Sequence, residues 1–132
     1  MLRTMTMRRR DFIRRVGAAA AGVAVAGCAD HAAYDTRALE RPELLAALGA
    51  NPVRAIGARY RAMTSDENDA GSLRDAIAAS RPFASRFLGA ADPTVAELIR
   101  ADFVHGRTVV VDGWILSATE ARQCALFSLL PA

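Results

Sequence analysis

The feature that most constrains this chain is a change of composition at Cys28. Before it, six Arg face one acidic residue, and Val16–Gly27 is a run of twelve residues that are Val, Ala and Gly only. As a helix this run would rise about 18 Å, short of the roughly 30 Å hydrocarbon core of a bilayer. A basic segment, a short apolar segment and a small-residue boundary predict a cleaved export signal, not a membrane-spanning helix.

The same boundary changes what the charge implies. The full chain carries 17 Lys+Arg and 14 Asp+Glu, a formal net charge of +3, and every one of the basic residues is Arg. From Cys28 onward there are eleven Arg and thirteen acidic residues, a net charge of −2. The basic excess therefore belongs to the export segment, and the charge gives no support for a nucleic-acid partner.

The basic segment has a specific pattern. Residues 9–14 (Arg-Arg-Asp-Phe-Ile-Arg) resemble the twin-arginine export signal, in which two Arg precede any residue, Phe, an aliphatic residue and a basic one. Arg8 stands where that signal usually has Ser or Thr. The resemblance implies that the twin-arginine export machinery recognises the segment and that the cargo folds before export. The residues that carry this resemblance are Arg9, Arg10, Phe12 and Ile13.

The end of the apolar run has a second pattern. Val25-Ala26-Gly27-Cys28 resembles the bacterial lipobox. That resemblance implies that residues 1–27 are a cleaved twin-arginine lipoprotein signal and that Cys28 is acylated. Acyl chains contribute about 0.8 kcal/mol per buried CH₂, so a multiply acylated Cys28 would anchor firmly. The implied location is the periplasmic face of a bacterial membrane. The alternative is that Cys28 is a buried free thiol in an Ala-rich helix.

After the signal, two regions are expected. Residues 28–41 lack strong periodicity and are predicted to tether the domain to the membrane. Residues 42–132 predict a mainly α domain of four to five helices with one short β-hairpin near the C-terminus. Helix starts are expected at Pro42, Asn51-Pro52, Ser72 and Asp92-Pro93.

Apolar residues at helical spacing predict the core. The inward-facing set is expected to be Val53, Ile56, Tyr60, Met63, Leu73, Ile77, Val95, Leu98, Ile99 and Phe103. A short helical turn within 82–91 is expected to pack through Phe83, Phe87 and Leu88. The loop 64–71 holds Asp66, Glu67 and Asp69 without the pattern of a calcium loop, so these acidic residues are expected to be solvated.

The C-terminal third changes period. The β-branched run 107–111, the turn dipeptide Asp112-Gly113 and the apolar run 114–116 predict a hairpin. Ser117 and Glu120 then have the spacing of a capping box, so Ser117 should begin the last helix. That helix, ending near Leu130, is apolar nearly all round, which predicts burial within the domain or against a partner.

Residues 113–120 (Gly-Trp-Ile-Leu-Ser-Ala-Thr-Glu) resemble a C-terminal segment shared by a group of small exported bacterial proteins, and the resemblance implies no activity. Two interpretations stay open. The segment is a folding motif that docks the hairpin on the last helix, or it is a recognition surface. In the second case Trp114 and Arg122 are the candidate partner contacts, because Trp and Arg are enriched at interface hot spots.

Residues with catalytic or ligating chemistry are few. His31, His105 and Cys124 show no metal-ligand spacing, so neither a metal nor a cofactor site is expected. Ser117, His105 and Asp112 lack a nucleophile-elbow sequence, so no catalytic residue is assigned. Cys124 lies on an apolar helix and is expected to pack in the core.

These observations favour a membrane-anchored periplasmic accessory subunit that carries and tethers a larger folded oxidoreductase. In organisation the chain resembles the small, signal-bearing subunits of periplasmic sugar and polyol dehydrogenases, although no motif is shared. The alternative is a stand-alone structural or ligand-binding lipoprotein without catalytic activity.

Overall fold

The computed structural model describes residues 35–132, and the predicted mainly α fold with a C-terminal hairpin is confirmed there. Four helices have ten residues or more and three are single turns, so the described chain has more helical segments than the four to five expected. The elements are α2 Thr36–Leu39, α3 Leu44–Leu48, α4 Ala50–Met63, α5 Ala70–Ala79, α6 Phe83–Phe87, α7 Val95–Val104, β1 Thr108–Val111, β2 Trp114–Ser117 and α8 Ala118–Ser128.

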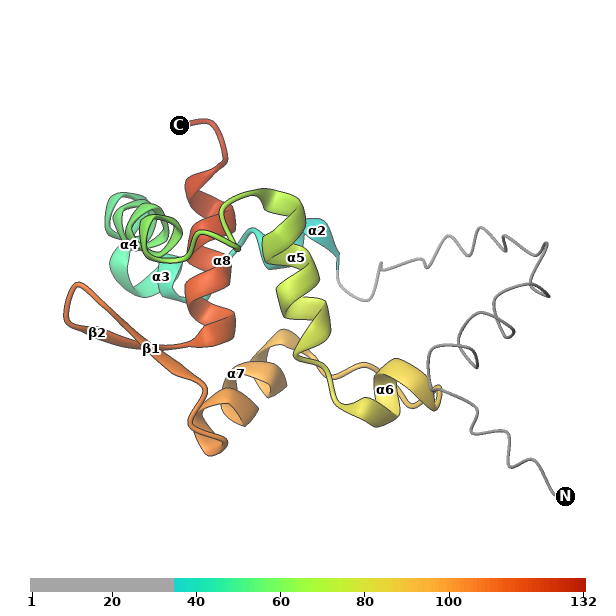
Figure 1. Ribbon diagram of the computed structural model, residues 1–132. Helices are drawn as coiled ribbons and strands as arrows, with labels where there is room; N and C mark the ends of the chain where they lie inside the picture. The colour runs from blue at the N-terminus through green and yellow to red at the C-terminus, as the bar shows by residue number, and fades with distance from the viewer. Residues whose placement is uncertain (1–34) are drawn as a thin grey trace, which may run out of the picture. The chain divides into compact units, whose positions relative to one another are not determined.

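Helix α8 is the centre of the domain. It lies between α4 and α5 in Figure 1, and it also contacts α7 and both strands. Its approach to α4 is very close, because a Cβ on Gly57 would overlap the carbonyl group of Cys124 and lie 2.8 Å from the Ala125 nitrogen. Most of the apolar residues predicted for this helix are therefore buried within the domain.

The hairpin has the predicted turn. Asp112 and Gly113 have φ of 48° and 85°, which is the left-handed backbone that a two-residue turn matching the strand twist needs. Val109 pairs with Leu116 and Val111 with Trp114 on one face, which packs on the helices through buried Val111 and Leu116. The alternate pair, Val110 with Ile115, therefore points outward.

Two of the predicted helix starts move because another side chain makes the cap. Helix α7 begins after Thr94, not at Asp92-Pro93. The Thr94 hydroxyl accepts from the Glu97 nitrogen at 3.2 Å, and the Glu97 carboxylate accepts from the Thr94 nitrogen at 2.7 Å. Asp92 instead pairs with Arg81. Helix α7 therefore starts where two backbone donors are satisfied reciprocally.

Helices α4 and α5, in contrast, begin earlier than predicted. Asp69 caps α5 in a capping box with Ser72, so Ser72 is the third helical residue and not the first. Gly49, with φ of 81°, ends α3 and directly precedes α4, so Asn51 already lies inside α4. These shifts are of one to three residues and leave the predicted inward faces of Val53 and Leu73 in place.

The folded domain starts before the predicted boundary at residue 42. Residues 36–39, expected in the tether, form α2, and Leu39 is buried in the core. Asp35 caps this turn by accepting from the Arg37 nitrogen at 3.1 Å. Glu40 pairs with Arg74 at 2.7 Å. Residues 36–40 show no apolar periodicity. They are held to the domain by the burial of Leu39 and by the ion pair between Glu40 and Arg74 on α5.

Several residues predicted to face inward are exposed instead: Met63, Phe83, Phe87, Leu88 and Phe103. In α7 the reason is Asp102, which lies one turn after Leu98 and occupies the inward position, so that Phe103 turns toward solvent. In α6 the single turn stands apart from the core. Within residues 35–132, every helix is too short or too polar to cross a membrane.

Candidate interaction surfaces

The predicted export and lipidation residues lie outside the described part of the chain. Arg9, Arg10, Phe12, Ile13 and Cys28 all precede residue 35, as does His31. The sites that can be placed are those of the C-terminal segment, of the acidic loop and of the exposed apolar side chains.

The predicted capping box is confirmed. The Ser117 hydroxyl accepts from the Glu120 nitrogen at 3.0 Å, and the Glu120 carboxylate accepts from the Ser117 nitrogen at 2.8 Å. Ser117 is fully buried, at the point where β2 passes directly into α8. The segment therefore does dock the hairpin on α8, and the Ser117 hydroxyl has a structural partner.

Arg122 ties α8 to the loop between α4 and α5. Its guanidinium donates to both carboxylate oxygens of Glu67, each at 2.8 Å, and the Tyr60 hydroxyl donates to Glu67 at 2.6 Å. Arg122 is therefore an internal contact, which removes it as a candidate partner contact. Glu67 is not a solvated loop acid as predicted. No local pattern could have shown this pair, because 55 residues separate its members.

The electrostatics of this cluster follow from burial and from the ion pair. Hydrogen bonds from Arg122 lower the pKa of Glu67 below its ordinary value, against the opposing effect of burial. Burial and the bond to Glu67 raise the pKa of Tyr60 to about 12. All three groups thus keep one protonation state through the neutral range, as suits a structural tie.

Asp102 is a buried junction that sequence reasoning missed. Its side chain is 1% exposed. One carboxylate oxygen accepts from the Thr119 nitrogen and the other from Arg107, each at 2.8 Å. Asp102 therefore joins α7, the entry to the hairpin and the first turn of α8, where its negative charge also suits the helix dipole. The sequence does contain one signal. Asp102 lies four residues after Leu98, at a position where the apolar stripe of α7 would continue with an apolar residue.

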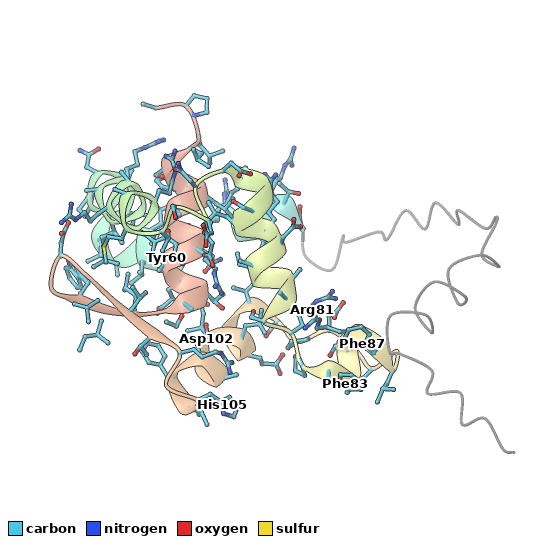
Figure 2. All side chains as sticks on the ribbon, viewed as in Figure 1. Tyr60, Arg81, Phe83, Phe87, Asp102 and His105 are labelled. Carbon is cyan, nitrogen blue, oxygen red and sulfur yellow. The ribbon has the colours of Figure 1, made fainter. Side chains whose placement is uncertain are left out.

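The remaining reactive side chains of residues 35–132 show no catalytic arrangement. Burial raises the pKa of Cys124 to about 12, and the nearby Glu120 adds to this, so the thiol is inert as expected for a core residue. His105 follows the end of α7 (Figure 2). No group of His, Cys, Asp or Glu within residues 35–132 could hold a metal ion.

The outward face of the hairpin is apolar and exposed. Val110 and Ile115 lie opposite each other across the two strands and are 58% and 67% exposed. Trp114, at the start of β2, is 46% exposed. Within residues 35–132 the sheet has two strands, so each also keeps one unpaired edge. This outward pair (Val110 and Ile115) is named here the hairpin face. Trp114 lies on the opposite face of the hairpin with Val111, and its exposure keeps it as a separate candidate partner contact.

A second apolar group lies on the loop 81–92, named here the α6 loop. Phe83, Phe87 and Leu88 are 66%, 61% and 70% exposed. The two rings are 4.9 Å apart between centroids, and Figure 2 shows both on α6 at the edge of the domain. Arg81 and Asp92 close the base of the loop with an ion pair of 2.7 Å.

An open groove lies near the start of the described chain. It has a volume of about 490 Å³ and is lined by Arg37, Glu40, Arg41, Leu45, Phe127 and Leu130. Beside it, the Arg54 guanidinium donates to the backbone oxygens of Leu130 at 2.6 Å and Pro131 at 2.8 Å. An apolar floor with arginines at the rim would suit an amphiphilic anion.

The described residues form a small, mainly helical domain with two exposed apolar groups, the hairpin face and the α6 loop. Comparison with protein-family models, curated proteins and solved structures gave no match for this chain.

Proposed function

We propose that this protein is an exported, lipid-anchored accessory subunit that carries a larger folded protein across the membrane and tethers it there. The observation that carries the proposal is the hairpin face. Val110 and Ile115 form a cross-strand apolar pair that the domain leaves uncovered, although its core is complete beneath them. Exposed apolar side chains grouped on an ordered element are typical of a protein-binding surface.

The rest of the chain supports a binding role. Ser117, Arg122 and Cys124 all have structural partners or full burial, and residues 35–132 present no metal-ligand cluster. The twin-arginine resemblance adds that the cargo is folded at export, which suits a carrier for a protein that takes up its cofactor in the cytoplasm. The partner is therefore expected to be an oxidoreductase without a signal of its own.

The test follows one partner through two variants. Arg9→Lys/Arg10→Lys is expected to retain both this chain and the partner in the cytoplasm. Arg3→Lys/Arg15→Lys, a matched change outside the twin pair, should leave both exported. Quantitative proteomics of the membrane and cytoplasmic fractions reads out the result. If export of this chain stops and no other protein changes compartment, the carrier role is wrong.

The hairpin face has its own test. Val110→Thr/Ile115→Thr keeps β-branched residues in both strands and should leave this chain exported. Loss of two apolar contacts at an interface centre lowers affinity by about tenfold or more, so the partner should leave the membrane fraction. A partner that stays bound would place the contact elsewhere on the domain.

The alternative of a stand-alone ligand-binding lipoprotein rests on the groove beside α2. Its arginines Arg37 and Arg41 and its apolar floor at Leu45 favour an amphiphilic anion. Native mass spectrometry of the purified chain would detect such a ligand, and Leu45→Asp should remove it. A ligand retained in this way, with no partner displaced in the proteomics, would favour this alternative.

A further inference from the structure

We propose that the α6 loop inserts its apolar tip into the membrane interface, so that the domain lies on the lipid surface with the hairpin face turned away. This rests on the proposed function in one respect, the anchor at Cys28. The loop's own side chains carry the rest of the argument.

The first observation is that the core does not use α6. Phe83, Phe87 and Leu88 are each more than 60% exposed, and α6 makes at most marginal contact with any other helix or strand of the described chain. Two Phe and one Leu on a single turn therefore have no packing role within the domain.

The second observation is that the loop is nevertheless well held. Besides the ion pair at its base, the Ser85 hydroxyl donates to the Ala91 oxygen at 2.9 Å, and the Ala90 nitrogen donates to the Ala84 oxygen at 3.2 Å. Arg81 also donates to the Ala78 oxygen at 3.0 Å, which fixes the loop to the end of α5. The tip is thus presented on a closed scaffold and does not collapse onto the core.

The third observation is charge. Residues 82–91 contain no acidic side chain, although the domain as a whole is acidic. The one charged residue is Arg86, whose guanidinium lies 5.0 Å from the centroid of the Phe87 ring and donates to the Ala79 oxygen at 3.2 Å. An arginine at the base of an apolar tip keeps its charge at the level of lipid headgroups while the rings go deeper.

Charge and the anchor favour lipid over a protein as the occupant. The tip combines three exposed apolar side chains with one arginine and no acidic residue, which suits an anionic lipid surface. Insertion into a lipid interface needs only a small apolar area, because the acyl anchor already holds the domain at the surface.

The anchor brings the loop within range. Asp35 follows Cys28 by seven positions, a span of at most about 25 Å, so the domain cannot move far from the bilayer. In Figure 1 the α6 loop and the hairpin project on opposite sides of α8. With α6 against the lipid, the hairpin face therefore remains accessible to a partner.

The single tryptophan provides the probe. In a Trp114→Phe background, Phe87→Trp places the only indole on the α6 loop, and Ile115→Trp places it at a similarly exposed position on the hairpin. Both chains are mixed with vesicles of phosphatidylethanolamine and phosphatidylglycerol that contain brominated lipid, which quenches indole fluorescence. The expected result is strong quenching and a blue shift for the α6 probe and neither for the hairpin probe.

Equal quenching of the two probes, or quenching of the hairpin probe alone, would overturn the proposal. A concentration-dependent blue shift of the α6 probe without vesicles would also overturn it, since a second copy would then cover the tip. The anchor has a separate readout, the acyl mass on Cys28. If Cys28 carries no acyl mass but the probe at position 87 is quenched, the anchor is refuted and the α6 contact stands. If Cys28 is acylated but the probe at position 87 is not quenched, only the α6 contact is refuted.

A pair of variants gives an independent measure. In a chain with Cys28→Ser, Phe83→Ser/Phe87→Ser should lower the vesicle partition constant by about tenfold or more, because two apolar groups leave the interface. Val110→Thr/Ile115→Thr in the same chain should leave it unchanged. Equal effects of the two pairs would contradict membrane contact through α6.

Discussion

Gly57→Ala should destabilise the domain, because the backbone of α8 lies directly against α4 at Gly57. A Cβ at this position would overlap the carbonyl group of Cys124 and lie 2.8 Å from the Ala125 nitrogen. Real Cβ atoms essentially never lie within 3.0 Å of such atoms. Both obstructing groups are backbone, so no side chain can move aside, and the two helices have to separate.

The size of the effect follows from two opposing contributions. Overpacking a well-packed core costs about 3 kcal/mol at the upper end of its usual range, and a rigid backbone obstruction justifies that end. Replacing Gly by Ala inside a helix stabilises it by about 1 kcal/mol. The net loss is about 2 kcal/mol of unfolding free energy, which in a domain of this size lowers Tm by about 10 °C.

Thermal and urea unfolding followed by circular dichroism measure this loss, and the chain offers a matched control. Gly71 lies in the first turn of α5, where a Cβ would meet only the Asp69 side chain at 3.1 Å. Gly71→Ala should change the unfolding free energy by less than about 1 kcal/mol. If Gly57→Ala unfolds with the same midpoint as Gly71→Ala, the close packing of α4 on α8 is wrong.

Three further results are expected. Asp102→Ala should lower the free energy of unfolding in urea by about 3 kcal/mol, because the buried Thr119 nitrogen loses its acceptor. Asp102→Asn keeps an acceptor and should lower it less. Equal losses for the two variants would argue against the bond from the Thr119 nitrogen. The pKa of Glu67 is lower in the folded than in the unfolded chain, so Glu67 stabilises the fold above about pH 4.5 and this contribution disappears as pH falls below that value. Unfolding free energies of the wild type and Glu67→Gln should therefore converge toward acid pH, and parallel curves would refute the pairing with Arg122. Cys124, with its pKa raised to about 12, should not react with a thiol reagent at mildly alkaline pH until urea unfolds the chain, and rapid reaction of the folded chain would contradict its burial.

The local features of the fold were predictable because they depend on neighbouring residues. The turn at Asp112-Gly113 requires left-handed backbone at both positions, and the box of Ser117 with Glu120 satisfies donors three residues apart. Both motifs carry their physical cause within a few residues of sequence. The hairpin and the start of α8 were therefore placed correctly.

What escaped prediction depends on contacts between distant segments. Glu67 meets Arg122 across 55 residues, and Asp102 meets Thr119 across 17. Neither pair has a local signature, so the sequence predicts Glu67 in solvent and predicts Phe103 on the inward face where Asp102 lies. Helical spacing shows which side chains share a face, but not whether anything covers that face.

The exposed phenylalanines illustrate the same limit with a functional consequence. Phe83 and Phe87 have the i, i+4 spacing of a core stripe, and the sequence predicts that they pack. The structure leaves both rings exposed, on a loop whose base is closed by the ion pair between Arg81 and Asp92. The two phenylalanines that the sequence wrongly places in the core are thus the side chains that form the exposed tip of the α6 loop.

The measurement that tests the central claim most directly is the distribution of proteins between membrane and cytoplasm in cells that carry Arg9→Lys/Arg10→Lys. The account predicts that this chain and one larger protein without a signal leave the membrane fraction together, and that Val110→Thr/Ile115→Thr releases the larger protein alone. It is contradicted if this chain remains in the cytoplasm while every other protein keeps its place.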